Sequence, residues 1–161
     1  MKKYFYFLSL LFVVAACTED IKFNNPAFQG LKDNVFWRAV GHNAAFSIEG
    51  NFVIEGSLGY EKVILQVDNN PAEKTYVLGV NDVVKASYVS TFPGKESEFS
   101  TGTKKGSGQI VITDYDAENN TISGTFKFNA VNSNTSDLDN PKVTFTEGVF
   151  YKVPITPRAL F

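Results

Sequence analysis

The segment from Gly108 to Ala130, GQIVITDYDAENNTISGTFKFNA, decides the fold. In its second half polar residues alternate strictly with an apolar or small set, namely Ile122, Gly124, Phe126, Phe128 and Ala130. A period of two with one polar face predicts an antiparallel strand that covers a core on one side. Asn119-Asn120 tolerates positive φ, so we expect a tight hairpin between this strand and the preceding one, Ile110 to Thr113.

Weaker versions of the same pattern recur along the chain. They cover residues 35–40, 44–48, 51–55, 60–67, 74–78, 85–91, 142–145 and 149–153. Between the last two segments Glu147-Gly148 predicts a β-bulge rather than a full turn, because the inward-facing set shifts by one residue there. Helical periodicity never exceeds two turns. The sequence therefore predicts an all-β domain, an antiparallel β-sandwich or flattened meander barrel of about 9–10 strands.

Two long polar stretches, residues 92–107 and 132–141, interrupt this series of strands. We expect both to be loops. Loops of this length are either functional or mobile.

The composition excludes several classes of function. Lys2 and Lys3 belong to an N-terminal leader that is described below. Without them the chain has 13 basic and 17 acidic residues, a net charge of −4, and no basic run, which argues against nucleic acid as a partner. Cys17 is the only cysteine and His42 the only histidine, so neither a disulfide within the chain nor a zinc site of several Cys or His ligands can form.

The first sixteen residues have the organisation of a signal peptide. Lys2 and Lys3 precede an apolar run, Tyr4 to Ala16, which only Ser9 interrupts. Its 13 residues are too few to span a bilayer. The run ends at Val13-Val14-Ala15-Ala16-Cys17, which resembles a bacterial lipobox, although Val14 stands where leucine is usual. We expect residues 1–16 to be removed and Cys17 to carry a diacylglyceryl group with acyl chains such as palmitate. An ordinary secretory signal and an uncleaved anchor are the alternatives.

We expect residues 17–31 to form the lipidated N-terminus and a tether, and residues 32–161 to form a single all-β domain. The residue after the cysteine is Thr18 rather than aspartate, so the familiar signal for inner-membrane retention is absent. This predicts a lipid-anchored protein of the outer membrane, on its periplasmic face or on the cell surface. Glu19-Asp20 resembles a surface-export signal of Bacteroidota-type lipoproteins, and a solvated acidic linker is the alternative.

A family resemblance extends over the last third of the chain. Its motifs are GQIVIT at 108–113, Tyr115-Asp116, ISGTF at 122–126 and TEGVF at 146–150. They resemble a family of small Bacteroidota-type lipoproteins that has no assigned activity. The resemblance implies an all-β fold and membrane anchoring, and it implies no mechanism.

One acidic series has the alternation of a calcium loop. Asp114, Asp116 and Glu118 alternate, but Asn119 and Thr125 occupy the positions where an EF-hand needs glycine and glutamate. We expect a solvated hairpin tip. The alternative is a weak calcium site completed by Asp137 or Asp139.

The remaining candidates for chemistry are isolated side chains. His42, between Gly41 and Asn43, reads as part of a turn, and the acids Glu49, Glu55 and Glu61 read as surface charge. We predict no catalytic residue, no metal site and no cofactor.

Three functions remain after these exclusions. The first is a non-enzymatic binding or accessory lipoprotein that holds a glycan or a partner protein with its loops. Trp37 reads as a core residue, which weakens the glycan version. The second is a small barrel around an apolar ligand, suggested by the 15 Phe and 7 Tyr residues. The third is an envelope enzyme, which has the least support.

Overall fold

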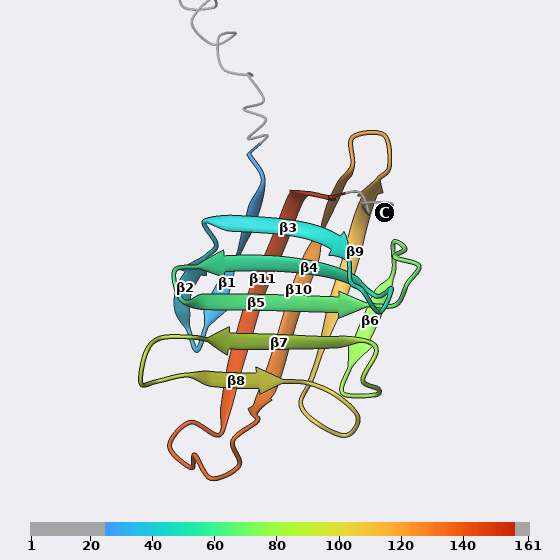
Figure 1. The fold of residues 1–161 in the computed structure, drawn as a ribbon. Helices are drawn as coiled ribbons and strands as arrows, with labels where there is room; N and C mark the ends of the chain where they lie inside the picture. Colours follow the sequence, from blue (N-terminus) through green and yellow to red (C-terminus); the bar gives the residue numbers. More distant parts are fainter. Residues whose placement is uncertain (1–24, 157–161) are drawn as a thin grey trace, which may run out of the picture.

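The computed structural model describes residues 25–156, which fold into eleven strands without a helix (Figure 1). The strands are β1 (Ala27–Lys32), β2 (Val35–Arg38), β3 (Gly41–Phe46), β4 (Phe52–Leu58), β5 (Glu61–Val67), β6 (Thr75–Leu78), β7 (Lys85–Ser90), β8 (Ser97–Ser100), β9 (Ser107–Asp116), β10 (Thr121–Asn132) and β11 (Lys142–Pro154). Within this range the chain contains no helix that could cross a membrane. The predicted all-β class is confirmed.

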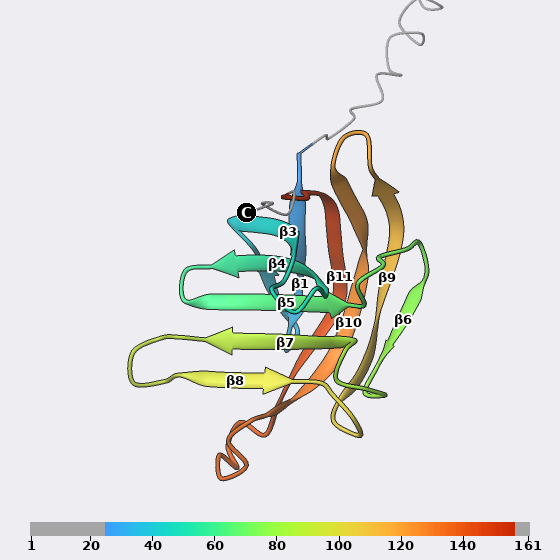
Figure 2. The same cartoon turned by 45° about the vertical axis from the view of Figure 1, so that its right-hand side comes forward.

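The strands form one curled antiparallel sheet in the order β2-β1-β11-β10-β8-β7-β5-β4-β3. β9 pairs with β10, and β6 extends the sheet beyond β9. The curl places β3, β4, β5, β7 and β8 in a front layer that crosses β1, β11, β10 and β9 behind it (Figures 1 and 2). The fold is thus a half-barrel with a sandwich-like interior, in agreement with the predicted sandwich or flattened barrel.

Two contacts join the layers along their sides. At the end of β10, beyond its pairing with β9, the strand pairs with β8 of the front layer, where Val131 faces Ser100. On the opposite side Ile155, just after β11, bridges Ala44 of β3, and the Thr156 N–H donates to the Ala44 carbonyl at 2.7 Å. These contacts hold the curl and enclose the core between the layers.

The hairpin of β9 and β10 forms as its sequence predicts. Phe126 faces Ile110 in the ladder, and the whole alternating set from Ile122 to Ala130 is buried. Asn120 has a φ of 52° in the connection, which asparagine accepts readily. Gly124 lies where β10 closely approaches its neighbours within the back layer: a Cβ there would lie 2.1 Å from the Val111 carbonyl oxygen of β9 and 2.4 Å from Phe150 Cζ of β11.

β11 is one long strand with two irregularities. The predicted bulge at Glu147-Gly148 is present: Glu147 has a φ of 51°, and the pairing of β11 with both neighbours shifts there. A second register shift follows near Lys152, whose φ is 47°. Bulges bend a strand and raise its twist, so they allow β11 to follow the curl of the sheet.

Aromatic side chains fill the space between the layers. Phe28, Phe126, Phe128, Phe145 and Phe150 are all at most 2% exposed. Neighbouring rings in this group have centroids 4.9 to 6.5 Å apart. Trp37 packs edge-on against this group and is buried, as its sequence context predicts.

Two expectations about connections are wrong. β1 lies largely within residues 17–31, so the sheet begins before the predicted end of the tether. Gly30 lies inside this strand, where a Cβ would lie 3.1 Å from Gly148 Cα across the ladder. Likewise β8 lies inside the predicted loop 92–107, and its Phe99 is buried in the core.

Candidate functional site

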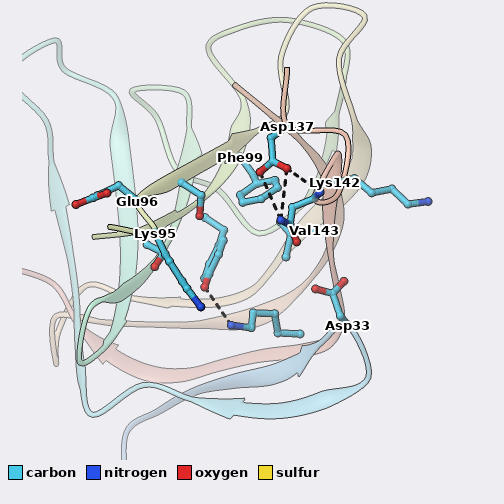
Figure 3. Close-up of a pocket in the computed structure, with 12 residues that line it drawn as sticks. Asp33, Lys95, Glu96, Phe99, Asp137, Lys142 and Val143 are labelled. Carbon is cyan, nitrogen blue, oxygen red and sulfur yellow. Dashed lines mark hydrogen bonds between the residues drawn. The ribbon is translucent and has the colours of Figure 1, made fainter. Parts of the chain in front are cut away.

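A hollow of about 570 Å³ lies at one end of the sheet, between the β7–β8 connection (91–96) and the β10–β11 connection (133–141) (Figure 3). We call it the mouth pocket. It is lined by Lys32, Asp33, Tyr88, Ser90, Lys95, Glu96, Ser97, Phe99, Asp137, Asn140, Lys142 and Val143. The two long polar stretches of the sequence therefore meet at one site, although β8 interrupts the first of them.

The floor of the mouth pocket belongs to the core. Tyr88 of β7 and Phe99 of β8 face each other in the ladder, with ring centroids 5.9 Å apart. Val143 of β11 lies beside them, and all three are buried. The floor is therefore apolar and fixed by packing on the interior.

A hydrogen-bonded cluster of four side chains, the Glu61 cluster, lies beside this floor. The Trp37 Nε1–H donates to Glu61 Oε2 at 2.6 Å, and the Tyr88 hydroxyl donates to Glu61 Oε1 at 2.7 Å. The Lys32 ammonium donates to Glu61 Oε1 and, at 3.0 Å, to the Tyr88 hydroxyl oxygen. The side chains of Lys32 and Glu61 are only 24% and 27% exposed. Glu61 is thus not the surface charge that its sequence context predicts.

The cluster holds its members in fixed charge states. Burial opposes ionisation of Glu61, but hydrogen bonds from Lys32, Tyr88 and Trp37 outweigh it and lower the pKa of Glu61. Burial also opposes the charge on Lys32, yet its bonds to Glu61 and Tyr88 raise the pKa of Lys32. Burial, supported by the bond to Glu61, raises the pKa of Tyr88. None of the three groups titrates near neutral pH.

Lys95 is the charged residue that reaches into the mouth pocket. Figure 3 shows its amine directed into the hollow, while the side chains of Glu96 and Lys142 extend away from it. Its backbone N–H donates to the Phe92 carbonyl at 2.9 Å, which closes the turn that contains Gly94 (φ 77°). Within residues 25–156 the Lys95 amine has no hydrogen-bond or ion-pair partner.

Side chain to backbone hydrogen bonds order the opposite wall. Asn132 Nδ2 donates to the Asn140 carbonyl at 2.9 Å and to Asp137 Oδ2 at 3.2 Å. Asp137 Oδ1 in turn accepts the Asn140 N–H at 3.1 Å. The β10–β11 connection is therefore a braced wall of the pocket.

A second hollow of about 520 Å³, the side groove, adjoins the mouth pocket and shares Ser90 and Lys95 with it. Its other side carries Tyr60 and Phe92, whose rings stand at 88° with centroids 5.5 Å apart. These two residues, the aromatic pair, are 56% and 50% exposed. Reasoning from the sequence missed them, although large aromatics next to the turn signals Gly59 and Pro93-Gly94 could have been noticed.

The predicted acidic series forms a hairpin tip. Asp116 Oδ1 accepts the backbone N–H groups of Glu118 and Asn119 at 3.0 and 2.9 Å, as in an Asx turn. The bonds from the Asn119 side chain and backbone lower the pKa of Asp116. Asp137 and Asp139 lie in the connection at the opposite end of the sheet (Figure 1). Among residues 25–156 no group of three or more His, Cys, Asp or Glu side chains is placed to hold a metal ion.

The other predicted residues lie apart from the mouth pocket. His42 is on β3 rather than in a turn, and its Nδ1 is buried without a hydrogen-bond partner in the described part of the chain. Glu55 pairs with Lys62 at 3.0 Å on a half-exposed face, and Glu49 is exposed in the β3–β4 turn. Cys17 lies outside the described residues.

Comparison with known proteins gives two matches. A family model described as a domain of unknown function (DUF6252) matches residues 24–154, which include all eleven strands. A model of the prokaryotic membrane lipoprotein lipid attachment site matches residues 1–18, a range that contains Cys17. No curated protein and no solved structure matches the chain.

Proposed function

Because the chain belongs to the DUF6252 family and has a lipoprotein lipid attachment site ahead of that domain, we propose that it is a lipid-anchored, non-enzymatic binding protein of the outer membrane. Cys17 is the acylated residue. The all-β domain holds its ligand in the mouth pocket, and the lipid keeps it at the membrane.

The observation that carries this proposal is the construction of the mouth pocket. Its floor packs on the core, its two walls are connections between strands of the sheet, and the Lys95 amine is directed into it. Ligand sites are generally concave and carry placed polar groups that fix the orientation of the ligand, and the mainly polar lining of the mouth pocket suits a polar ligand. Binding residues are also concentrated on loops that a rigid scaffold positions.

The position of the pocket suits an anchored protein. β1 begins at Ala27, close in sequence to the lipid attachment site, and ends at Lys32, which together with the following Asp33 lines the mouth pocket. The pocket thus lies at the end of β1 that is farther along the chain from Cys17. This arrangement supports capture of a ligand away from the lipid surface.

The charge states around the pocket favour binding over catalysis. Proton transfer is efficient when the pKa of the acid or base is near the working pH. The pKa of Glu61 is lowered, and those of Lys32 and Tyr88 are raised, so each moves away from neutrality. The enzyme alternative therefore has no support from these three groups.

The apolar-ligand alternative has less support than a ligand in the mouth. It would need space between the two layers, where the rings of Phe28, Phe126, Phe128, Phe145 and Phe150 pack on one another. The phenylalanine content that suggests a ligand barrel is accounted for by this packing.

The anchor is tested in cells. Cys17→Ser should abolish incorporation of a labelled fatty acid and leave an uncleaved precursor, and Ser9→Ala is the matched control within the leader. Membrane fractionation of the wild type should place the protein in the outer membrane. Labelling that persists in Cys17→Ser, or an inner-membrane location, would contradict the proposal.

The pocket is tested with the mature lipidated protein in detergent. Saturation-transfer NMR is recorded on three mixtures: neutral and acidic oligosaccharides, dipeptides, and fatty acids. Ser97→Trp places a bulky ring in the mouth pocket and should remove the signal of the bound class, while Ser107→Trp, the same change at an exposed position of β9 outside the pocket, should keep it. Signals that survive Ser97→Trp, or no signal from any mixture, would refute the mouth pocket as the site.

A further inference from the structure

We infer that the mouth pocket and the side groove together bind an acidic oligosaccharide, a chain of sugars that carry carboxylate groups. This inference rests on the proposed binding function and names its ligand class. It is argued from the aromatic pair, the neutral polar groups between the two hollows, and Lys95.

The aromatic pair provides a platform for sugar rings. The Tyr60 and Phe92 rings are half exposed and contact each other edge to face. Hydrogen bonds join the backbone segments that carry them: Thr91 donates its N–H and its hydroxyl to the Tyr60 carbonyl at 2.9 and 3.2 Å. A fixed, exposed aromatic face gains by covering apolar C–H groups. A pyranose ring offers such a C–H face and keeps its hydroxyl groups at the rim, free for polar partners.

Neutral polar side chains stand where those hydroxyl groups would lie. Ser90 and Ser97 face each other across the β7–β8 ladder, and Asn140 lies on the opposite wall. Hydroxyl and amide groups both donate and accept, as sugar hydroxyls do. The two hollows meet at Ser90 and Lys95, so a ligand of more than one sugar unit can extend from one into the other.

The charge on Lys95 selects an acidic sugar. Lys32 is neutralised by Glu61. The carboxylates of Asp33 and Asp137 also line the pocket and keep their negative charge, but each is engaged by a backbone N–H group, from Thr144 at 2.9 Å and from Asn140 at 3.1 Å respectively. Of the charged groups that line the mouth pocket among residues 25–156, Lys95 alone lacks a partner and is directed inward. One ammonium at the junction of two sugar-sized hollows suits a carboxylate on one ring of the chain.

An acidic peptide fits this site less well. Extended peptides are commonly bound by pairing with a free strand edge. At the mouth pocket β7 and β8 pair with each other, and on the outer side of β8 the Glu98 carbonyl already accepts the Ser133 N–H at 2.7 Å.

The test measures affinity by isothermal titration with the mature lipidated protein. The probes are oligomers of galacturonate, alginate and hyaluronan, and the uncharged match is the methyl-esterified galacturonate oligomer. We expect at least one acidic oligomer to bind about tenfold more tightly than an uncharged oligomer, and to lose affinity as salt is added.

Three variants separate the contributions. Lys95→Gln should weaken the acidic oligomer about tenfold and leave uncharged oligomers unchanged, while Tyr60→Ala should weaken both kinds. Lys127→Gln, which removes an exposed charge on β10 away from the pocket, is the control and should change neither. Circular dichroism confirms that each variant is folded.

Each other outcome overturns the inference in a recognisable way. Equal binding of acidic and esterified oligomers, or no effect of Lys95→Gln, removes the acidic ligand class and leaves the pocket as a binding site. If no oligosaccharide binds in the titration, but dipeptides or fatty acids give NMR signals that Ser97→Trp abolishes, the sugar ligand is refuted and the proposed binding function is kept. Silence in both experiments refutes both.

Discussion

Glu61→Gln should destabilise the protein by about 2–3 kcal/mol. The carboxylate accepts hydrogen bonds from Trp37, Tyr88 and Lys32, and bonds to a charged group are worth about 1.5–3 kcal/mol each. Lys32 is a quarter exposed, so water replaces much of its lost partner, whereas Trp37 and Tyr88 are nearly buried. Glutamine keeps one acceptor oxygen for one of the donors but directs its amide group toward the others. The expected loss is therefore larger than that of a neutral hydrogen bond and smaller than the sum of three bonds to a charged group.

The matched control is Glu55→Gln. Glu55 pairs with Lys62 at 3.0 Å, but both side chains are close to half exposed. Such a pair contributes about 0–1 kcal/mol. Urea unfolding, followed by circular dichroism and by the emission of Trp37, the only tryptophan in the chain, compares the two variants with the wild type.

The effect of Glu61→Gln should depend on pH in one direction. A lowered pKa means that the contribution of Glu61 is present above its ordinary value of 4.5 and is lost as the pH falls through its folded value. The raised pKa of Lys32 places the loss of its charge above 10.5. The destabilisation should therefore be constant between about pH 5 and about pH 9 and shrink in acid. A cost no larger than that of Glu55→Gln, or one that grows in acid, would refute this account of the cluster.

Three further predictions concern packing and the pocket wall. Gly124→Ala should lower the free energy of unfolding by about 3 kcal/mol or more, because the new Cβ meets the Val111 carbonyl and the Phe150 ring. Thr125→Ala, on the outer face, is the control and should lower it by less than about 1 kcal/mol. The midpoints of urea unfolding compare the two variants, and a tolerated Gly124→Ala would contradict the close approach. Phe145→Ala should lower the free energy of unfolding by about 3–5 kcal/mol, since four aromatic rings lose their neighbour. Phe36→Ala, at an exposed site, should lower it far less. Similar unfolding midpoints for the two variants would refute this difference. Asp137→Ala should speed hydrogen exchange in residues 133–141 with little change in global stability, whereas exchange at wild-type rates would show that the wall does not depend on this carboxylate.

The strongest local pattern predicts the fold well, because one face of each strand is buried. In β10 the period of two, and at Glu147 the shift in that period, follow directly from which side chains meet the core. β1 and β8 are harder to predict for a physical reason. In β1, Gly30 breaks the alternation of side chains because it lies close to Gly148 across the ladder, and β8 contributes only Phe99 to the core.

The candidate site was largely beyond reach of the sequence because contacts between distant residues create it. Glu61 lies 24 residues from Trp37 and 29 from Lys32, so nothing nearby in the chain marks it as a cluster member. The sequence predicts the two long polar stretches, but their meeting at one end of the sheet depends on the topology. No sequence signal around Lys95 indicates that its amine is directed into the pocket.

The place of β1 in the sheet also has a mechanical consequence. β1 is the first strand after the anchor, and it is held on both sides, by β2 and by β11. Under the proposed function, a force between the lipid and a ligand in the mouth pocket would act from the Ala27 end of β1 toward its Lys32 end and would shear both ladders, so that many hydrogen bonds would share the load. A strand peeled from an edge would instead lose its bonds one after another. The domain should accordingly resist a pull on its own tether.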